Sequence, residues 1–311
     1  MSGTGRALVL GGGGVAGIAW LTGVLAGLAT AGADVTDADA LIGTSAGSTV
    51  AAQLGSGMGL RELLARQVDP GLQNREVTPS GSVTVAEFAE IWARLSAEID
   101  DPAEMRRALG ARALAAVTIP EPERRAVIEG RLPVHEWPSR RLLVTAVNAL
   151  TGERRVFDRD SKVDLVDAVA ASSAVPMIWP PVTIQGVRYV DGGVWSVNNV
   201  GLAAGYERVL LVAPMEDPGL DVDIAAVEER GGRVEVINPD EASAAAFGDD
   251  PLDPATRTPA AGAGLAQGEA IAARVAEFWV EDWRQPPTVV AQELSRPGGE
   301  QHAQRGEASP G

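Results

Sequence analysis

The sequence predicts an α/β fold with a mostly parallel sheet and a helical insertion, and three observations support this class. Residues 7–10 form an apolar strand that enters four consecutive glycines. A second strand, residues 40–42, enters another glycine turn, and helical patterns at 18–29 and 46–54 follow the two turns. Strand character returns after residue 141. Strands that alternate with helices pair in parallel, because a parallel crossover needs about the length of a helix.

Composition and charge narrow the classes of function. The 311 residues are 45% hydrophobic and 22% charged, which is ordinary for a soluble globular protein. The net charge of −16 argues against a nucleic-acid partner, because binding polyphosphate requires a basic surface. The chain has no cysteine, which excludes disulfides and thiolate chemistry. We recognise neither a membrane-spanning run of roughly 18 to 20 apolar residues nor a secretion signal, so we expect a cytoplasmic protein.

We expect residues 1–290 to form one domain, and residues 291–311 to form a tail with the composition of disorder. Within the domain, residues 55–138 are expected to form the helical insertion. Its apolar residues recur at helical spacing, which predicts helices that pack their apolar faces on a core.

Two start signals place helices inside this insertion. Thr84 and Glu87 form a capping box directly before a run with helical periodicity. Asp101, followed by proline, starts a further helix, and we expect Gly110 to end it.

The second half of the chain returns to strands. The segment 141–148 and the short segment 155–157 flank a Thr-Gly turn, which predicts a hairpin. A helix at 164–172 must end before Pro176, because the residue preceding a proline avoids the α region. A long loop rich in Ala, Asp and Pro is expected before a last helix at 265–283. The remaining strands are predicted at residues 182–184, 187–190, 209–212 and 234–237.

Ser45 is the candidate nucleophile. It lies in the pattern Gly43-Thr44-Ser45-Ala46-Gly47, between an apolar strand and an Ala-rich helix. Small residues on both sides let the chain turn sharply and hold the serine Oγ exposed above the sheet. The helix that follows directs its positive dipole end at this hydroxyl. The pattern alone also fits a plain Gly-Ser turn, and its position between strand and helix favours the catalytic interpretation.

The base for such a serine must come from a carboxylate or a histidine. His135 precedes the candidate aspartate and lies in a turn-like segment, and His302 lies in the tail, so the Ser, Asp, His order of an α/β-hydrolase triad is not met. Asp191 ends an apolar strand and is followed by two glycines, which allow another group to approach closely. This carboxylate could accept the Ser45 proton directly. A type I turn that begins with Asp is the other interpretation.

The glycine-rich loop also fits a second class of enzyme. The spacing Gly12-x-Gly14-x-x-Gly17 after a strand is a dinucleotide-binding fingerprint. That function needs an acidic residue at the end of the second strand to bind ribose hydroxyls. Here Asp39 precedes that strand and no acid ends it, so an oxidoreductase is the weaker interpretation.

Three blocks in order resemble the patatin-like phospholipases. They are the glycine loop, the serine elbow and Asp191-Gly192-Gly193, with a run from Ala171 to Pro181 that is also similar. Together they bracket residues 6–195. The resemblance implies a three-layer α/β/α fold and the cleavage of acyl esters of phospholipids and other lipids, without a metal or a cofactor.

The resemblance also implies roles for single residues. Ser45 would be the nucleophile and Asp191 its general base. The chain departs from the family at Ala16, where many members carry Arg or Lys, so a cationic contact to phosphate is lost there. The oxyanion hole would be formed by the backbone N–H groups of Gly12, Gly13, Gly14 and Val15, and the motif would be supported by Gly17, Gly43, Gly47, Gly192 and Gly193.

Three further residues are candidates for a substrate pocket, namely Met177, Ile178 and Trp179, and core packing explains them equally well. The expected partner is a lipid or other acyl-ester substrate, which allows a transient contact with a membrane surface. Because fold does not fix function, a non-catalytic lipid- or protein-binding member of the same fold stays open as an alternative.

Overall fold

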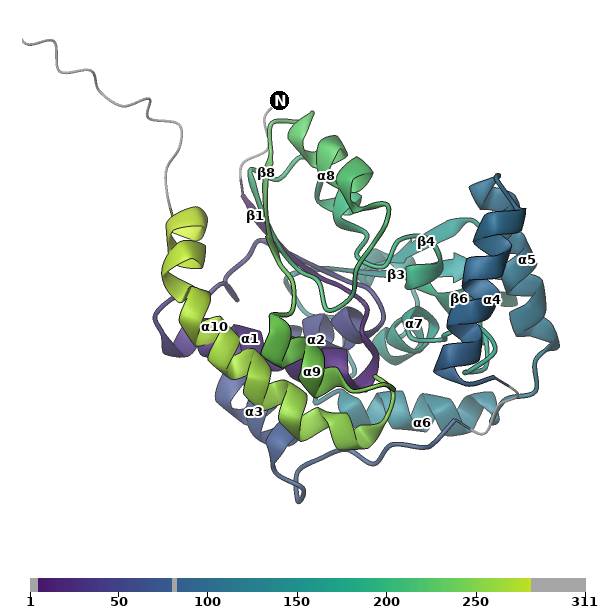
Figure 1. Ribbon diagram of the computed structural model, residues 1–311, viewed down its shortest axis with the longest axis horizontal. Coiled ribbons are helices and arrows are strands. Elements are labelled where there is room, and N and C mark those ends of the chain that lie inside the picture. Colours follow the sequence, from purple (N-terminus) through teal and green to yellow (C-terminus); the bar gives the residue numbers. More distant parts are fainter. Residues whose placement is uncertain (1–4, 80–82, 281–311) are drawn as a thin grey trace, which may run out of the picture. The chain divides into compact units, whose positions relative to one another are not determined.

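A computed structural model describes residues 5–79 and 83–280, which lie in one compact unit, Met1–Val280. Eight strands of these described residues join one sheet (Figure 1). They are β1 (Arg6–Leu10), β2 (Ala40–Gly43), β3 (Arg141–Asn148), β4 (Arg154–Phe157), β5 (Val182–Ile184), β6 (Val187–Asp191), β7 (Arg208–Val212) and β8 (Arg233–Ile237).

The sheet has the order β5-β6-β3-β2-β1-β7-β8, and β4 pairs with β3 outside this path. Strands β3, β2, β1, β7 and β8 are parallel to one another. The pairs β3–β4, β3–β6 and β5–β6 are antiparallel. The predicted mostly parallel sheet and the predicted hairpin at β3 and β4 are therefore confirmed. β6 runs antiparallel to β3. Its last residue therefore lies beyond the C-terminal end of β2, which pairs with the first half of β3.

Helices cover both faces of the sheet, which confirms the three-layer α/β/α class. Side chains of β1 alternate between two cores, because successive residues of a strand point to opposite faces. Leu8 and Leu10 pack in the larger core, and Ala7 and Val9 pack in the smaller one. In Figure 1, the face of the sheet with the smaller core carries α8 (Leu220–Glu228). The face with the larger core carries α1 (Gly14–Thr30), α2 (Ala46–Gly55), α3 (Leu60–Val68), α9 (Glu241–Phe247) and α10 (Arg257–Val280).

Residues 55–138, predicted as the helical insertion, contain α3 together with α4 (Val85–Glu98), α5 (Pro102–Ala115) and α6 (Glu121–Arg131). The capping box is confirmed, since Thr84 Oγ1 accepts a hydrogen bond from Glu87 N at 3.2 Å. The predicted end of α5 at Gly110 is wrong. A Cβ at Gly110 would overlap the carbonyl oxygen of Ala149. This glycine therefore permits close packing inside the helix and does not terminate it.

Two boundaries differ from the prediction near the ends of the chain. Helix α1 starts at Gly14 and not at residue 18, because the glycine loop passes directly into the helix. The long loop expected before the last helix instead contains α9 and the first two turns of α10. Asp240 caps α9 by accepting a hydrogen bond from Ser243 N at 2.8 Å. The end of the predicted last helix, 281–283, and the predicted tail, 291–311, lie outside the described residues.

Helices α7 (Leu165–Ser172) and α2 also contact each other on the larger core, so the end of α7 lies beside the start of α2. This contact matters for the site.

None of the helices in the described part of the chain is long and apolar enough to span a bilayer.

The packing of α1 on α10 gives a matched pair of glycine substitutions. A Cβ at Gly264 would come 2.5 Å from the carbonyl oxygen of Trp20, whereas a Cβ at Gly262 would meet nothing within 4 Å. Gly264→Ala should lower the free energy of unfolding by about 1–3 kcal/mol through overpacking. Gly262→Ala should raise it by about 0.5–1 kcal/mol, because alanine favours the helix. Chemical denaturation of both variants tests this, and equal effects would contradict the packing described.

Candidate active site

Ser45 lies on a strained turn between β2 and α2. Its backbone has φ 52° and ψ −114°, a conformation that residues with a side chain rarely adopt. Close packing imposes this turn. A Cβ at Gly47 would overlap the carbonyl oxygen of Leu10, and Gly47 N donates a hydrogen bond to Gly11 O at 3.0 Å. The first turn of α2 is thereby held against the end of β1, and Ser45 takes the resulting sharp bend.

The backbone of Ser45 is fixed from the side by the end of α7. Ser45 N donates a hydrogen bond to Ser172 Oγ at 2.9 Å, and Ser173 Oγ donates one to Ser45 O at 3.4 Å. These two serines lie in the run that resembles the family, but the sequence alone assigned them no role. Their contacts hold the peptide in place while leaving the Ser45 side chain outside these bonds.

Asp191 ends β6 and is almost completely buried, with 5% of its surface exposed. Its Oδ1 accepts a hydrogen bond from Gly193 N at 2.7 Å. A Cβ at Gly192 would overlap Thr145 Oγ1, so glycine is required where β6 leaves the sheet beside β3. The second carboxylate oxygen, Oδ2, has no hydrogen-bond partner among the described residues.

Burial raises the pKa of Asp191 from the ordinary aspartate value of 3.8 to about 7. Three contacts oppose this effect of burial in part, namely the hydrogen bond from Gly193, the Ser45 hydroxyl and the positive charge of Arg124. Ser45 and Asp191 therefore lie beside each other, although Oδ2 accepts no hydrogen bond of ordinary geometry from the serine. Hydrogen bonds in unliganded catalytic sites are often long or poorly aligned.

The glycine loop presents free amide groups next to Ser45. Gly12 N donates to Val197 O and Ala16 N donates to Pro251 O, each at 3.0 Å. Within the described residues, the amides of Gly13, Gly14 and Val15 donate no hydrogen bond. Of the predicted oxyanion donors, these three are unengaged and the Gly12 amide is already occupied.

The amide of Ala46 is also without a hydrogen-bond partner among the described residues. The oxyanion hole predicted from the sequence did not include this amide. The signal was present, because in serine elbows the residue after the nucleophile donates its N–H to the oxyanion.

A pocket opens beside Ser45, but its cavity has a volume of only about 20 Å³, which is room for about one water molecule. Trp179 lines it. Met177 and Ile178 do not line it, since Met177 packs in a core with Val190 and Ile178 packs against Trp179. The other lining residues are Gly14, Val15, Ile18, Ala46, Glu76, Val77, Arg124, Arg131, Ser173, Val175 and Leu252.

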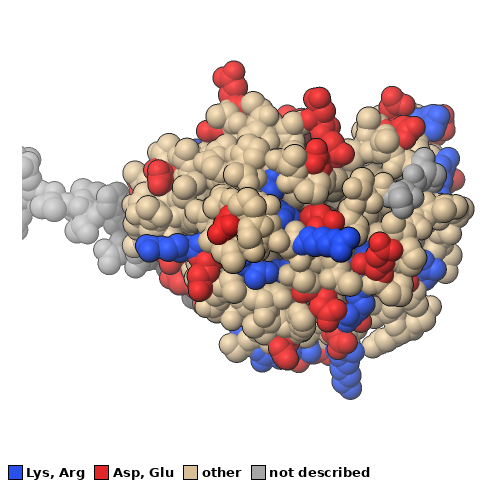
Figure 2. All heavy atoms as spheres, turned by 90° about the horizontal axis from the view of Figure 1, so that it is seen from below, with Lys and Arg blue, Asp and Glu red and all other residues tan. Residues whose placement is uncertain are grey.

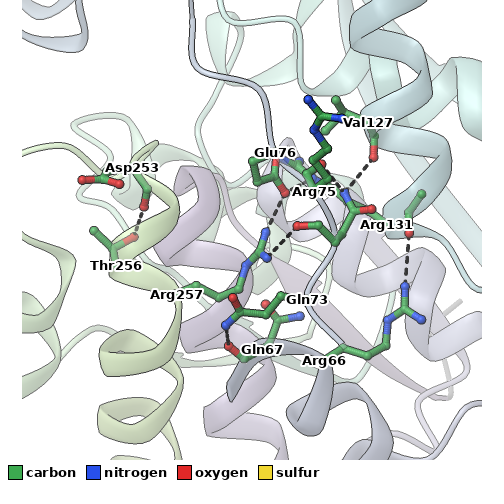
Figure 3. Close-up of polar contacts among 12 residues, drawn as sticks. Arg66, Gln67, Gln73, Arg75, Glu76, Val127, Arg131, Asp253, Thr256 and Arg257 are labelled. Carbon is green, nitrogen blue, oxygen red and sulfur yellow. Dashed lines mark hydrogen bonds and ion pairs between the residues drawn. The ribbon is translucent and has the colours of Figure 1, made fainter. Parts of the chain in front are cut away.

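One wall of the pocket holds a buried charge cluster that sequence analysis missed. Glu76 is bonded by Arg131 on α6 and by Arg257 on α10, both at 2.6 Å (Figure 3). Burial raises the pKa of Glu76, but the arginines outweigh it and hold the pKa below its usual value. Arg124 lies 4.0 Å from the same carboxylate. Only the fold brings these residues together, because α6 and α10 are far apart in the chain.

Arg124 differs from its neighbours, since it stacks on Trp179 with its guanidinium carbon 3.8 Å from the ring centroid. Burial and repulsion from Arg131 lower its pKa to about 9, against the attraction of Glu76 and Asp191. Arg124 therefore stays positively charged at neutral pH.

The histidines offer no alternative base in the described part of the chain. His135 Nε2 lies 3.1 Å from Glu129 O at the surface, and His135 is not among the residues that line the pocket. His302 lies outside the described residues. Among the described residues, no group of three or more acidic or histidine side chains could hold a metal ion.

A strained serine at a strand-to-helix turn, beside a buried carboxylate and free amides, is an arrangement typical of α/β acyl hydrolases. The chain belongs to the patatin-like phospholipase family, because the family profile "Patatin-like phospholipase" matches residues 8–204. That match supports a lipid acyl hydrolase at the level of the family, and it sets aside the dinucleotide-binding interpretation of the glycine loop.

Two solved structures are similar to the chain. VipD from Legionella pneumophila has a TM-score of 0.45 and 14% identity, covering 88% of this chain and 67% of that one. The type III effector protein ExoU has a TM-score of 0.39 and 18% identity, covering 88% of this chain, which spans 53% of that one. No curated protein matches the sequence. At these similarities the substrate must be inferred from the chain's own site.

The raised pKa of Asp191 predicts a pH-dependent cost to stability. The folded state holds the proton more tightly than the unfolded chain, so this cost is absent below about pH 4, grows as pH rises, and is complete above about pH 7. The free energy of unfolding of Asp191→Asn minus that of wild type should therefore be larger at pH 8 than at pH 4 by about 1–4 kcal/mol. Denaturant titrations at several pH values measure this difference.

Asp221→Asn is the matched control, because Asp221 is exposed on α8. Its unfolding free energy should follow that of wild type over the whole range. If the Asp191→Asn difference were independent of pH, the buried carboxylate would not have the environment described.

Proposed function

We propose that this protein is a serine acyl hydrolase of lipid esters, of the phospholipase A or lysophospholipase type, with Ser45 as nucleophile and Asp191 as general base. One observation carries the proposal: the strained Ser45 lies beside a buried carboxylate whose pKa is raised to about 7. A base with a pKa near the working pH is ionised in a large fraction of molecules and still accepts a proton readily. Family membership supports the same chemistry.

In the acylation step, Asp191 takes the proton of Ser45 while Oγ attacks the ester carbonyl. The amides of Gly13, Gly14, Val15 and Ala46 are the proposed donors to the resulting oxyanion, aided by the N-terminal dipole of α2. When the tetrahedral intermediate collapses, the C–O bond of the ester breaks and the proton passes from Asp191 to the leaving alcohol.

In the deacylation step, water loses a proton to Asp191 and its oxygen attacks the acyl-serine carbonyl. The acyl–Oγ bond breaks, the fatty acid leaves, and the proton returns to Ser45 Oγ. The cavity beside Ser45 has room for about one water molecule, which suits this step. An acyl chain needs more space than this cavity offers, so the pocket must widen when substrate binds.

An acyl chain would meet an apolar lining, because Val77, Val175, Trp179 and Leu252 border the cavity. Contact with a membrane surface would be transient. The chain carries a net charge of −16, and the face in Figure 2 shows acidic and basic side chains interspersed, without a gathered basic patch. We propose a cytoplasmic enzyme that reaches its substrate at or near such a surface.

Loss of either proposed residue should strongly reduce ester hydrolysis. Ser45→Ala should lower kcat/KM on p-nitrophenyl esters by about 1,000-fold or more, since the nucleophile is lost. Asp191→Asn should lower it by about 100- to 10,000-fold, the contribution typical of a positioned base. Ser56→Ala, at the other end of α2, is the control and should keep wild-type activity. Wild-type rates in either active-site variant would exclude the proposed pair.

The pKa of Asp191 also predicts the pH profile. Only the ionised carboxylate can accept the serine proton, so kcat/KM should rise with pH through an apparent pKa near the value of about 7. Initial rates on a neutral ester between about pH 5 and pH 9 test this. A flat profile, or one that falls with pH, would contradict Asp191 as the base.

A further inference from the structure

Two buried donor groups beside the Ser45 pocket have no acceptor within the described part of the chain. Arg124 is 5% exposed, and its Nε and Nη1 atoms have no hydrogen-bond partner among the described residues. Trp179 is 3% exposed, and its indole Nε1 is likewise without a partner. Leaving buried donors unsatisfied costs free energy, and more so when the group is charged. Both residues line the pocket that contains Ser45.

The charges around Arg124 compensate it only in part. Glu76 is the nearest carboxylate at 4.0 Å, but both of its oxygens are bonded at 2.6 Å by Arg131 and Arg257. Three guanidinium groups therefore share one carboxylate. Figure 3 shows how Glu76 is engaged from the α10 side by Arg257. An anion that enters the pocket would find a positive charge already desolvated and held in place by its stacking on Trp179.

The position of Arg124 fits a role in substrate recognition. Arg124 and Ser45 line the same pocket, so the guanidinium lies close to the nucleophile. Position 16 in the glycine loop is a fully buried alanine and supplies no charge there. A cation from α6, in the helical insertion, thus occupies the active-site pocket although the loop lacks one.

We propose that Arg124, assisted by the Trp179 indole N–H, binds a negatively charged group of the substrate next to the scissile ester, so that preferred substrates are anionic acyl esters. This inference rests on the proposed function. Two sources supply such a group, the phosphate of a phospholipid or lysophospholipid and the carboxylate of an acylated hydroxy acid. Both are oxyanions that accept hydrogen bonds from a guanidinium.

The test compares pairs of esters with the same acyl chain. One pair is a monoacylglycerol phosphate and the uncharged monoacylglycerol, and the other is an acylated hydroxycarboxylate and its methyl ester. Wild type should prefer the charged member in at least one pair. Arg124→Gln should reduce that ratio of kcat/KM values by about 10- to 100-fold, the range of a hydrogen bond to a charged group. The pair with the larger loss identifies phosphate or carboxylate.

Further variants separate recognition from folding. Arg124→Lys keeps the charge but not the planar fork and should give an intermediate ratio. Trp179→Phe keeps an aromatic ring but removes the indole N–H. It should lower the ratio by about 2- to 10-fold, the range of a neutral hydrogen bond. Arg125→Gln is the matched control on the same helix, because Arg125 bonds Asp167 away from the pocket and should keep the wild-type ratio. Equal losses on both members of each pair would overturn the proposal.

A binding measurement keeps the inference separate from hydrolysis. Ser45→Ala should bind the monoacylglycerol phosphate or the acylated hydroxycarboxylate more tightly than its neutral counterpart in calorimetry, and adding Arg124→Gln should remove the difference. Hydrolysis of neutral esters without any anionic preference would overturn only the role of Arg124. Absence of hydrolysis with preserved anionic binding would overturn only the proposed function.

Discussion

The contact between the first turn of α2 and the end of β1 is the constraint on which the site depends. Gly47 lies so close to Leu10 O that no side chain fits, and its N–H is bonded to Gly11 O. This packing forces Ser45 into its strained conformation and sets the glycine loop beside it. The strain is retained because the surrounding sheet and helices over-determine the turn, as is common where a functional group must be held in a fixed position.

The same surroundings bury two charged groups, Asp191 and Arg124, which destabilise the fold and benefit only function. Burying Asp191 costs stability once the carboxylate ionises, and burying Arg124 with two donor atoms unbonded among the described residues adds a further cost. A protein selected for stability alone would replace both groups by apolar side chains. Their retention beside Ser45 is explained if each has a task in turnover, one with the proton and the other with substrate charge.

Much of the fold could be predicted from the sequence because its signals are local. Strand and helix alternation, the capping box at Thr84 and the turn of the β3–β4 hairpin each lie within a few residues. The wrong end predicted for α5 at Gly110 shows the limit of such local signals, because that glycine is required by close packing against Ala149, which is distant in the sequence. The candidate nucleophile and base were predictable from motifs. The charge cluster around Glu76 was not, because distant helices assemble it.

The hydrogen bond from Gly12 N to Val197 O joins two motifs that lie far apart in the sequence. The glycine loop is tied through it to the segment that directly follows Asp191. A Cβ at Gly11 would also overlap Asn198 Oδ1, so the two segments interlock sterically. In a rearrangement at the mouth of the pocket, the amides of the glycine loop and the carboxylate of Asp191 would therefore move together. Transplanting the glycine loop into another scaffold would require this second segment as well.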